Sequence, residues 1–299
     1  MDFGRLTDTD FDSLDFSLPA EPDFNKEILS KAPTAKTKFF AGCAKWGRKD
    51  WVGSIYPPGT KEADFLNHYG KHFNSIELNA SFYRMPSNAQ TSSWRKKVPA
   101  DFIFCPKVTG QLSHVKRLKD IQEQLERFIN GISGFGKNLG PVLLMPHPGM
   151  GPKTLPLIET FSRSLPPEMS LFVELRHESW FVENNKQQML NSFADNNIGL
   201  VITDVAGRRD CAHMTLTVPK AFIRFNGNGL HPTDYKRIDE WVTRIDLWQQ
   251  QGIHEVYFFM HQHDERHSPV LCKYLVEKLN EVCHANLPVP EFVGTDIVN

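Results

Sequence analysis

The chain has 299 residues, 40% of them hydrophobic and 11% aromatic, which is enough to fill one large core or two small ones. Its 34 Lys and Arg residues nearly balance its 35 Asp and Glu residues, so no overall charge excess indicates nucleic acid or an anionic membrane as a partner. The N-terminus is acidic and lacks the apolar core of a signal peptide, and no run of about 18 apolar residues is present to cross a bilayer. We therefore expect neither secretion nor a membrane span.

The first 36 residues differ in composition from the rest of the chain. They alternate Asp with Phe, hold eight acids against four bases, and end in the sequence KAPTAKT. This composition is typical of a segment that either stays disordered or lies as an arm on the body. We expect an acidic N-terminal extension over residues 1–36 and one folded domain over residues 37–299.

From residue 38 onward one pattern repeats: a short apolar run rich in β-branched and aromatic residues, a polar turn, and a stretch with helical spacing. Alternation of strands with helices is typical of a parallel sheet. Eight such units in roughly 260 residues predict an α/β fold, a single (β/α)8 TIM-type barrel. The expected strands are residues 38–46, 75–83, 101–108, 139–146, 171–177, 199–205, 221–226 and 255–263.

The sixth unit is irregular, because residues 206–219 (AGRRDCAHMTLTVP) are too short and uneven for a full helix. The alternative fold, an open doubly wound sheet, often carries a Gly-rich phosphate turn after its first strand. The turn after the first expected strand, GCAKWGRKDWVGS, has no G-x-G-x-x-G pattern. We therefore favour the barrel.

The cysteines are spread along the chain without close-spaced pairs or zinc-finger spacing, and their number is odd. This argues against a disulfide framework. We expect a reducing cytoplasm as the location. The cysteines are Cys43, Cys105, Cys211, Cys272 and Cys283.

Polar side chains gather at the ends of the expected strands, where the chemistry of a (β/α)8 barrel collects. Glu174 and Arg176, in the run LFVELRH, are two apart in a strand and so project to the same side. Carboxylates in such a place can act as general acid or base. Lys107 can form a Schiff base if it is desolvated, whereas pairing with Glu77 would keep it charged and inert. The candidate catalytic residues are Glu77, Lys107, Glu174 and Asp204.

Basic and aromatic residues beside these strand ends are the candidates for substrate binding. Arginines hold anionic groups, and aromatic rings stack on a sugar or a base. We expect the deepest pocket to open among Trp46, Glu77, Lys107, Glu174, Arg176, Asp204, Arg224 and His261. The candidate substrate-binding residues are Trp46, Asn79, Tyr83, His114, Arg176, His177, Trp180, Arg224 and Asn226.

His261 and His263 make a divalent metal one candidate cofactor. Their spacing of two would aim both imidazoles at one ion, with Glu77, Glu174 or His177 as further ligands. The alternative is a chance His-x-His in a chain with 12 histidines. Both interpretations stay open on the sequence.

Several separated strings together resemble the YecE-like proteins, a bacterial family known as domain of unknown function 72. The strings include GCAKWGRKDWVGSIYPPG, FNSIELNASFYRMPS, FIFCPKV, VELRHESW and FIRFNG, and the resemblance runs from about residue 38 to 280. It implies a TIM-type barrel and no established activity. The family's characteristic positions fall on Trp46, Trp51, Tyr56, Glu77, Asn79, Tyr83, Lys107, His114, Glu174, Arg176, His177, Trp180, Asp204 and Arg224.

Two departures from the family pattern imply an altered pocket. In the run LLMPHPG, which begins in the fourth expected strand, Leu144 stands where the family tends to carry Gln. In the last two motifs, Asn226-Gly227 and Met260-His261-Gln262 replace the usual His-Gly and Phe-Asn-Asn.

Three functions stay open on this sequence. The first is binding or conversion of a small metabolite, phosphorylated or sugar-like, with Lys107, Arg176 and Arg224 on its anionic group. The second is nucleic-acid binding or a metal-dependent, nuclease-like activity, by analogy with other proteins of this fold. The third is a non-catalytic protein in which the strand-end charges neutralise one another. The sequence does not determine the oligomeric state.

Overall fold

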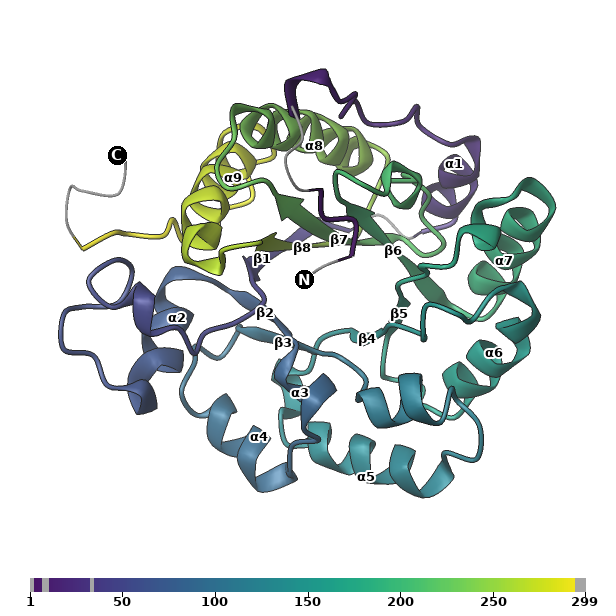
Figure 1. Cartoon of the computed structure of the whole chain (residues 1–299), viewed down its shortest axis with the longest axis horizontal. Coiled ribbons are helices and arrows are strands. Elements are labelled where there is room, and N and C mark those ends of the chain that lie inside the picture. Colours follow the sequence, from purple (N-terminus) through teal and green to yellow (C-terminus); the bar gives the residue numbers. More distant parts are fainter. Residues whose placement is uncertain (1–2, 7–10, 33–34, 294–299) are drawn as a thin grey trace.

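The computed structural model describes residues 3–6, 11–32 and 35–293. Parallel strands lie at the centre of the molecule and helices surround them (Figure 1). Every expected strand is present, and several end earlier than predicted because the residues that follow already belong to the βα connections, which for residues 80–83 means a short helix. The strands are β1 (Lys38–Cys43), β2 (Ser75–Leu78), β3 (Ile103–Pro106), β4 (Val142–Leu144), β5 (Leu171–Val173), β6 (Ile198–Asp204), β7 (Lys220–Gly227) and β8 (Glu255–Gln262).

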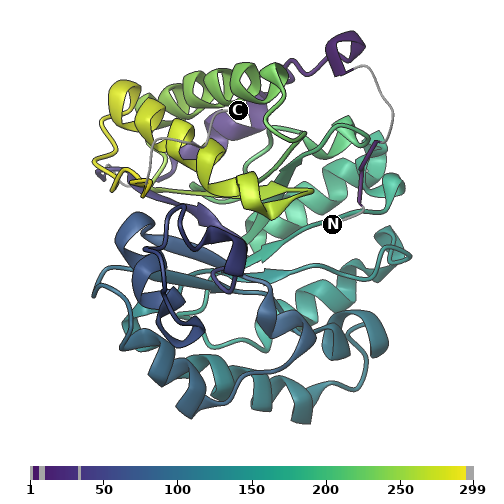
Figure 2. The same ribbon diagram turned by 60° about the vertical axis from the view of Figure 1, so that its left-hand side comes forward.

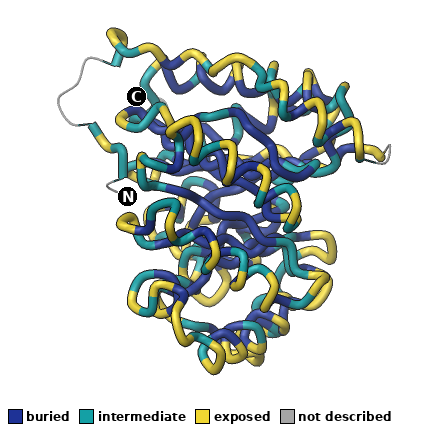
Figure 3. The backbone as a smooth tube through the Cα atoms, turned by 90° about the vertical axis from the view of Figure 1, so that its right-hand side faces the viewer, coloured by how far each residue is buried: buried dark blue, intermediate teal, exposed yellow. Residues whose placement is uncertain are grey.

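The helices form an outer layer, with α8 and α9 on one side of the strands and α4 and α5 on the other (Figure 2). Apolar residues at helical spacing bury one face of the longer helices, as Leu125, Phe128 and Ile132 do in α5. Buried backbone is therefore concentrated in the centre and along the inner faces of the helices (Figure 3). The helices are α1 (Asp23–Ser30), α2 (Phe65–His72), α3 (Ala80–Tyr83), α4 (Asn88–Arg95), α5 (Gln122–Ser133), α6 (Leu155–Arg163), α7 (Glu183–Asp195), α8 (Pro232–Gln250) and α9 (Ser268–Val282).

None of the helices in the described part of the chain combines the length and the apolar character that a membrane span needs.

The strands form two sheets and not the one continuous sheet that was expected. Six strands pair in the order β1-β8-β7-β6-β5-β4, and β2 pairs with β3. Between β3 and β4 the backbone contact is reduced to the isolated parallel bridges Phe104–Leu139 and Lys107–Leu143. The structure is therefore an α/β fold with a curled, parallel six-stranded half-barrel, and the prediction of a barrel is confirmed only at that level.

Side chains replace the backbone ladder between β1 and β2. Asn74 accepts a hydrogen bond from the N–H of Ala41 at 2.9 Å and donates one to the carbonyl of Phe39 at 2.8 Å. The hydroxyl of Tyr69 lies 2.7 Å from the backbone nitrogen of Cys43 and 3.0 Å from the carbonyl oxygen of Ser75. These contacts satisfy backbone groups that the broken ladder leaves without a partner strand.

Inward-facing residues change character along the strands. Near the strand starts they form an apolar cluster that includes Phe172, Phe222 and Tyr257. Two residues further along, the same faces carry Glu174 on the β5 side and Arg224 on β7. The interior therefore has an apolar floor, and its charged groups lie toward the carboxyl ends of the strands.

The sixth unit lacks a full helix, as expected, and the N-terminal extension covers this region. After β6 the chain forms only a short 3-10 turn, Arg209–Cys211. Asn25 of α1 is fully buried, donates to the carbonyl of Met214 at 2.8 Å and accepts from the N–H of Leu216 at 2.7 Å. The described parts of the extension thus lie as an arm on the body.

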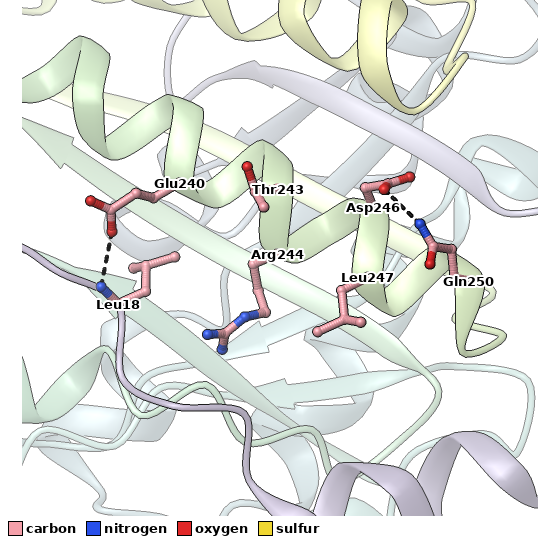
Figure 4. A pocket seen from close by; sticks show the side chains of 7 residues that line it. All are labelled: Leu18, Glu240, Thr243, Arg244, Asp246, Leu247 and Gln250. Carbon is pink, nitrogen blue, oxygen red and sulfur yellow. Dashed lines mark hydrogen bonds between the residues drawn. The ribbon is translucent and has the colours of Figure 1, made fainter.

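Residues 16–21 continue this arm along α8. The N–H of Leu18 donates to Glu240 at 3.1 Å, and the guanidinium of Arg244 donates to the carbonyl of Pro19 at 2.7 Å. Figure 4 shows the open surface pocket of about 510 Å³ that Leu18 forms with the α8 side chains. None of the predicted site residues lines it.

Candidate functional site

A buried ion-pair network links β2, β5 and β7 at the carboxyl end of the strands. Arg224 donates to both oxygens of Glu77, at 2.8 and 2.9 Å, and to both oxygens of Glu174, at 2.7 and 2.8 Å. Their side chains are at most 1% exposed to solvent. Because the guanidinium binds two carboxylates bidentately, it fixes β2 relative to β5 and β7.

The neighbouring groups keep both carboxylates ionised. Burial alone would raise the pKa of Glu174, but the guanidiniums of Arg176 and Arg224 lower it to about 2. Arg176 pairs with Glu174 at 3.0 Å, and the hydroxyl of Thr203 donates to the same carboxylate at 3.1 Å. The pKa of Glu77 is also held well below its ordinary value, since Arg224 and His261 outweigh the effect of burial.

Glu77 has two further partners at the carboxyl end of the strands, which we call the mouth. Asn79 donates to it at 2.8 Å, and Nε2 of His261 lies 3.2 Å from its other oxygen. With Arg224 on both oxygens as well, the hydrogen-bonding capacity of this carboxylate is used by three side chains.

Lys107 follows β3 and lies beside this network without joining it. Its side chain is buried, and the residue is 4% exposed. Among the described residues, the ion pairs of Glu77 and Glu174 run to Arg224, Arg176 and His261, and Lys107 has no carboxylate within ion-pair distance. Its ammonium nitrogen lies 5.0 Å from the centre of the Phe82 ring. Burial, together with the charge of Arg224, lowers the pKa of Lys107 to about 7.

A cavity of about 490 Å³ opens above this network. It joins residues from loops and strand ends that are far apart in the sequence. A second cavity of about 320 Å³ shares Lys45, Asn79 and Tyr83 with it and is otherwise mainly apolar, with Trp46 on its wall. The larger cavity is lined by Lys45, Asn79, Phe82, Tyr83, Lys107, Met145, Arg176, His261 and Glu265.

His114 approaches this region from the loop after β3. Its ring packs edge-on against Phe82 at 5.0 Å and against His147 at 5.5 Å, and Nδ1 lies 2.9 Å from the hydroxyl of Ser113. Burial lowers the pKa of His114 to about 4, and the charges of His147 and Lys107 act in the same direction. His114 is therefore neutral near pH 7.

Residues 40–291 match the family model described as "Protein of unknown function DUF72". The chain belongs to the DUF72 family. This confirms the resemblance to the YecE-like proteins. UPF0759 protein YecE of Escherichia coli (strain K12) is 27% identical over 261 residues, which cover 81% of this chain and 93% of YecE. UPF0759 protein YunF of Bacillus subtilis (strain 168) is 38% identical over 76 residues, a quarter of either chain.

Solved structures of DUF72 family proteins share the fold of this chain. A protein from Thermotoga maritima matches with a TM-score of 0.64 at 23% identity and covers 82% of this chain and 99% of its own. A protein from Enterococcus faecalis matches with a TM-score of 0.65 at 17% identity, over 87% and 100% of the two chains. At these identities the likeness concerns the fold alone.

Of the fifteen predicted site residues of this DUF72 protein, five line the cavity and five more lie next to it. Asn79, Tyr83, Lys107, Arg176 and His261 line it. Glu77, Glu174 and Arg224 form the buried network with which Arg176 and His261 pair. Trp46 lines the adjoining cavity, and His114 packs against the cavity residue Phe82.

Asp204 does not belong to this site, contrary to the prediction. It ends β6 and binds side chains of α8, with Arg237 at 2.8 Å and Trp241 Nε1 at 2.8 Å, and it also pairs with Arg209. Its neighbour Thr203 bonds to Glu174 instead. Adjacent strand residues point to opposite faces, so Asp204 lies on the helix side of the sheet.

Trp180 and His177 also lie away from the cavity. Trp180 is 1% exposed, and its indole N–H donates to the carbonyl of Met150 at 2.8 Å, so it is a core residue. His177 caps the short turn Glu178–Phe181 through the N–H of Ser179 at 3.3 Å. Neither side chain is among the residues that line the two cavities at the mouth.

Asn226 is buried two residues after Arg224, so the two share a face of β7. Its Nδ2 has no hydrogen-bond partner among the described residues. This is the one predicted binding residue whose amide donor is buried without a partner in that part of the chain.

The predicted metal pair is not assembled into a ligand cluster. His261 is held by Glu77. Across residues 3–6, 11–32 and 35–293, no group of three or more His, Cys, Asp or Glu side chains is placed to hold a metal ion. Among the described residues, His263 therefore does not belong to a group of side chains that could bind a metal ion together.

Sequence reasoning missed several residues at the mouth. Lys45 lies two residues after β1, Met145 directly follows β4, and Glu265 lies four residues after His261, so their closeness to strand ends was an available signal. Phe3 gave no such signal. Its ring lies 4.2 Å from the guanidinium carbon of Arg176, which brings residues 3–6 over the centre of the strands (Figure 1).

Proposed function

We propose that the mouth cavity binds a small anionic metabolite, phosphorylated or sugar-like, and that Lys107 takes part in its conversion. The observation that carries this proposal is the cavity wall, where Lys45 and Arg176 outnumber the carboxylate of Glu265 even when Lys107 is neutral. Glu77 and Glu174 lie beneath the wall and are shared: Arg224 binds both, Arg176 also pairs with Glu174, and His261 also lies against Glu77. A phosphate or carboxylate group supplies the missing negative charge.

The adjoining apolar cavity is evidence that the same ligand contains a ring. Tyr83 is 85% exposed and lines both cavities, and Trp46 lines the apolar one. Exposed aromatic faces stack on sugar rings and on bases. The buried, unpartnered amide of Asn226 supports a further hydrogen bond at the strand ends.

We assign different roles to the three candidate catalytic groups that are close to the cavity. Glu77 and Glu174 stay ionised and hold Arg224 and Arg176, which makes them positioning residues. Lys107 changes its protonation state near neutral pH, which suits proton transfer or nucleophilic attack.

We infer that the two sheets close into one (β/α)8 barrel that forms a domain over residues 37–299. The bridges between β3 and β4 and the Asn74 and Tyr69 contacts between β1 and β2 support closure. Strand β1 begins at Lys38, which supports the boundary after residue 36.

We also propose a reducing cytoplasm as the location of the protein. The five cysteines are free and buried, which supports this proposal.

Ligand-dependent melting tests the binding site. The full chain is melted with inorganic phosphate, ribose 5-phosphate and ribose, because a bound ligand raises the melting temperature as RT ln(1 + [L]/Kd). We expect a rise with the two phosphates and a smaller rise with ribose. Arg176→Met should lose the rise, and Arg127→Met, a surface control on α5, should keep it.

Two outcomes contradict the proposal. One is an equal phosphate response in wild type and Arg176→Met. The other is no response in wild type together with a large loss of stability in Arg176→Met, which favours a structural charge network without a ligand.

A further inference from the structure

Lys107 combines three features that anion binding alone does not require. It is buried at the end of β3, it borders the mouth cavity, and the nearby carboxylates are bound by other groups. A lysine that serves only as a cation normally pairs with a carboxylate or stays in water. The surroundings of Lys107 therefore favour the neutral amine, and a neutral amine is a nucleophile.

The groups around Lys107 indicate which electrophile would meet it. Arg176 and Lys45 line the same cavity and would hold an anionic group beside the amine. Asn79 and His261 lie on the same wall and are both tied to Glu77, which keeps their orientation constant. A carbonyl compound with an anionic substituent fits this arrangement.

We propose that Lys107 forms a covalent imine with the carbonyl carbon of a small aldehyde or ketone that carries a phosphate or carboxylate group. This inference rests on the proposed anion-binding function and adds the substrate class and the reaction type to it. The proposal is based on the surroundings of Lys107. Its amine is buried at a strand end, lies beside cationic side chains and has no carboxylate partner among the described residues.

The chemistry balances without an oxidant or a reductant. The nitrogen lone pair of Lys107 attacks the carbonyl carbon, the C=O π bond breaks, and the oxygen takes up a proton to give a carbinolamine. The hydroxyl then leaves as water after a second protonation, and the nitrogen loses one proton and forms the C=N bond. The net reaction joins amine, carbonyl and one proton into a protonated imine and water.

Borohydride trapping tests this proposal on the full chain. The wild-type protein is incubated with glyceraldehyde 3-phosphate, or with glyceraldehyde as the neutral control, and then reduced with sodium borohydride. Reduction converts the imine into a stable secondary amine, which peptide mass spectrometry assigns to a residue. We expect one main adduct, at Lys107, formed at least about tenfold faster with the phosphorylated aldehyde, a difference of about 1.4 kcal/mol.

The exposed lysines Lys71 and Lys137 serve as internal controls in the same sample. Labelling of Lys107 no faster than theirs overturns the proposal. Because the adduct is mapped in wild type, the result does not depend on a variant that fails to fold. Lys107→Arg, whose melting temperature is measured alongside, should lose the adduct.

Failure of the imine and failure of the anion site give different results. Phosphate stabilisation without an adduct at Lys107 rejects the imine and leaves the proposed binding function. An adduct at Lys107 that forms equally fast with both aldehydes rejects the anionic substrate class. Absence of both the stabilisation and the adduct rejects both proposals.

Discussion

At the scale of single residues, Arg224 is the centre of the molecule's charge network. It is fully buried and donates to four carboxylate oxygens, of Glu77 and Glu174. A buried ion pair contributes modestly overall because desolvation offsets much of the attraction between the charges. Removal of one partner is different, since it leaves the other charges buried and uncompensated.

Arg224→Met should therefore destabilise the protein strongly. We expect the free energy of unfolding to fall by about 3–5 kcal/mol, since two buried carboxylates lose their main partner. Urea unfolding measures this, with Arg127→Met as the surface control. A loss below about 1 kcal/mol would mean that the network relaxes or takes up protons at little cost.

The ionised state of Glu174 predicts how stability depends on pH. Its pKa is about 2 in the folded protein against an ordinary value of 4.5, so the folded state binds its proton less readily than the unfolded chain. The contribution of Glu174 to stability is then fully present above about pH 4.5 and is lost as the pH falls toward about 2. Acidification through this range should lower the free energy of unfolding.

Urea midpoints measured between about pH 5 and pH 2 test this for Glu174 itself. Glu174→Gln cannot titrate, so its stability should fall less steeply with acid than that of wild type. Glu178→Gln, an exposed control nearby, should keep the wild-type slope. Equal slopes in wild type and Glu174→Gln would show that this carboxylate does not carry the acid sensitivity.

At the scale of elements, α1 compensates for the irregular sixth unit. Its buried Asn25 satisfies the carbonyl of Met214 and the N–H of Leu216, which lie in the segment without a helix. Glu21, just before α1, accepts from the indole of Trp248 in α8 at 3.0 Å. The arm therefore supports part of the outer layer that a sixth helix would otherwise supply.

Asn25→Ala should loosen this region. We expect a loss of about 1–3 kcal/mol, because two buried backbone groups lose their partner. Hydrogen exchange should accelerate at Leu216, whose N–H is released. Lys26→Ala, on the exposed face of α1, should change neither quantity. Unchanged exchange at Leu216 in Asn25→Ala would show that the contact with α1 is dispensable.

At the scale of the whole molecule, the junction between β1 and β2 decides how the two sheets approach each other. Gly42 sits at this junction, and a Cβ atom there would lie 2.0 Å from the carbonyl oxygen of Ser75. Tyr69 links the same two strands through its hydroxyl. The close approach therefore requires the absence of a side chain at Gly42.

Gly42→Ala should force β1 and β2 apart. We expect a loss of about 1–3 kcal/mol or more, as for overpacked cores, measured by urea unfolding. Gly47→Ala is the matched control, because a Cβ atom at Gly47 would meet nothing within 4 Å. Equal stability of the two variants would mean that the sheets are not held at the distance observed.

The sequence allowed the strands to be predicted, because they depend on local periodicity, and it indicated several of the residues that the structure brings together at the cavity. Apolar runs separated by helical stretches located the strands. The expected neighbours Glu174 with Arg176 and Glu77 with Asn79 do contact each other, although of these four residues only Glu77 lies inside a strand. Strand ends then indicated the mouth. The prediction for Asp204 was wrong because β6 is buried on both faces and shows no polar alternation. The sequence of β6 therefore does not show which of its residues face the interior.

Only the tertiary structure decided which charges pair and which residues meet from distant parts of the chain. The sequence left Glu77 free to pair with Lys107, but Arg224 binds that carboxylate and leaves the lysine without one among the described residues. Contacts such as Phe3 on Arg176 and α1 beside the segment after β6 join residues far apart in sequence. Local patterns determine strands and faces, whereas burial and three-dimensional packing determine the partners and so the protonation state of the site.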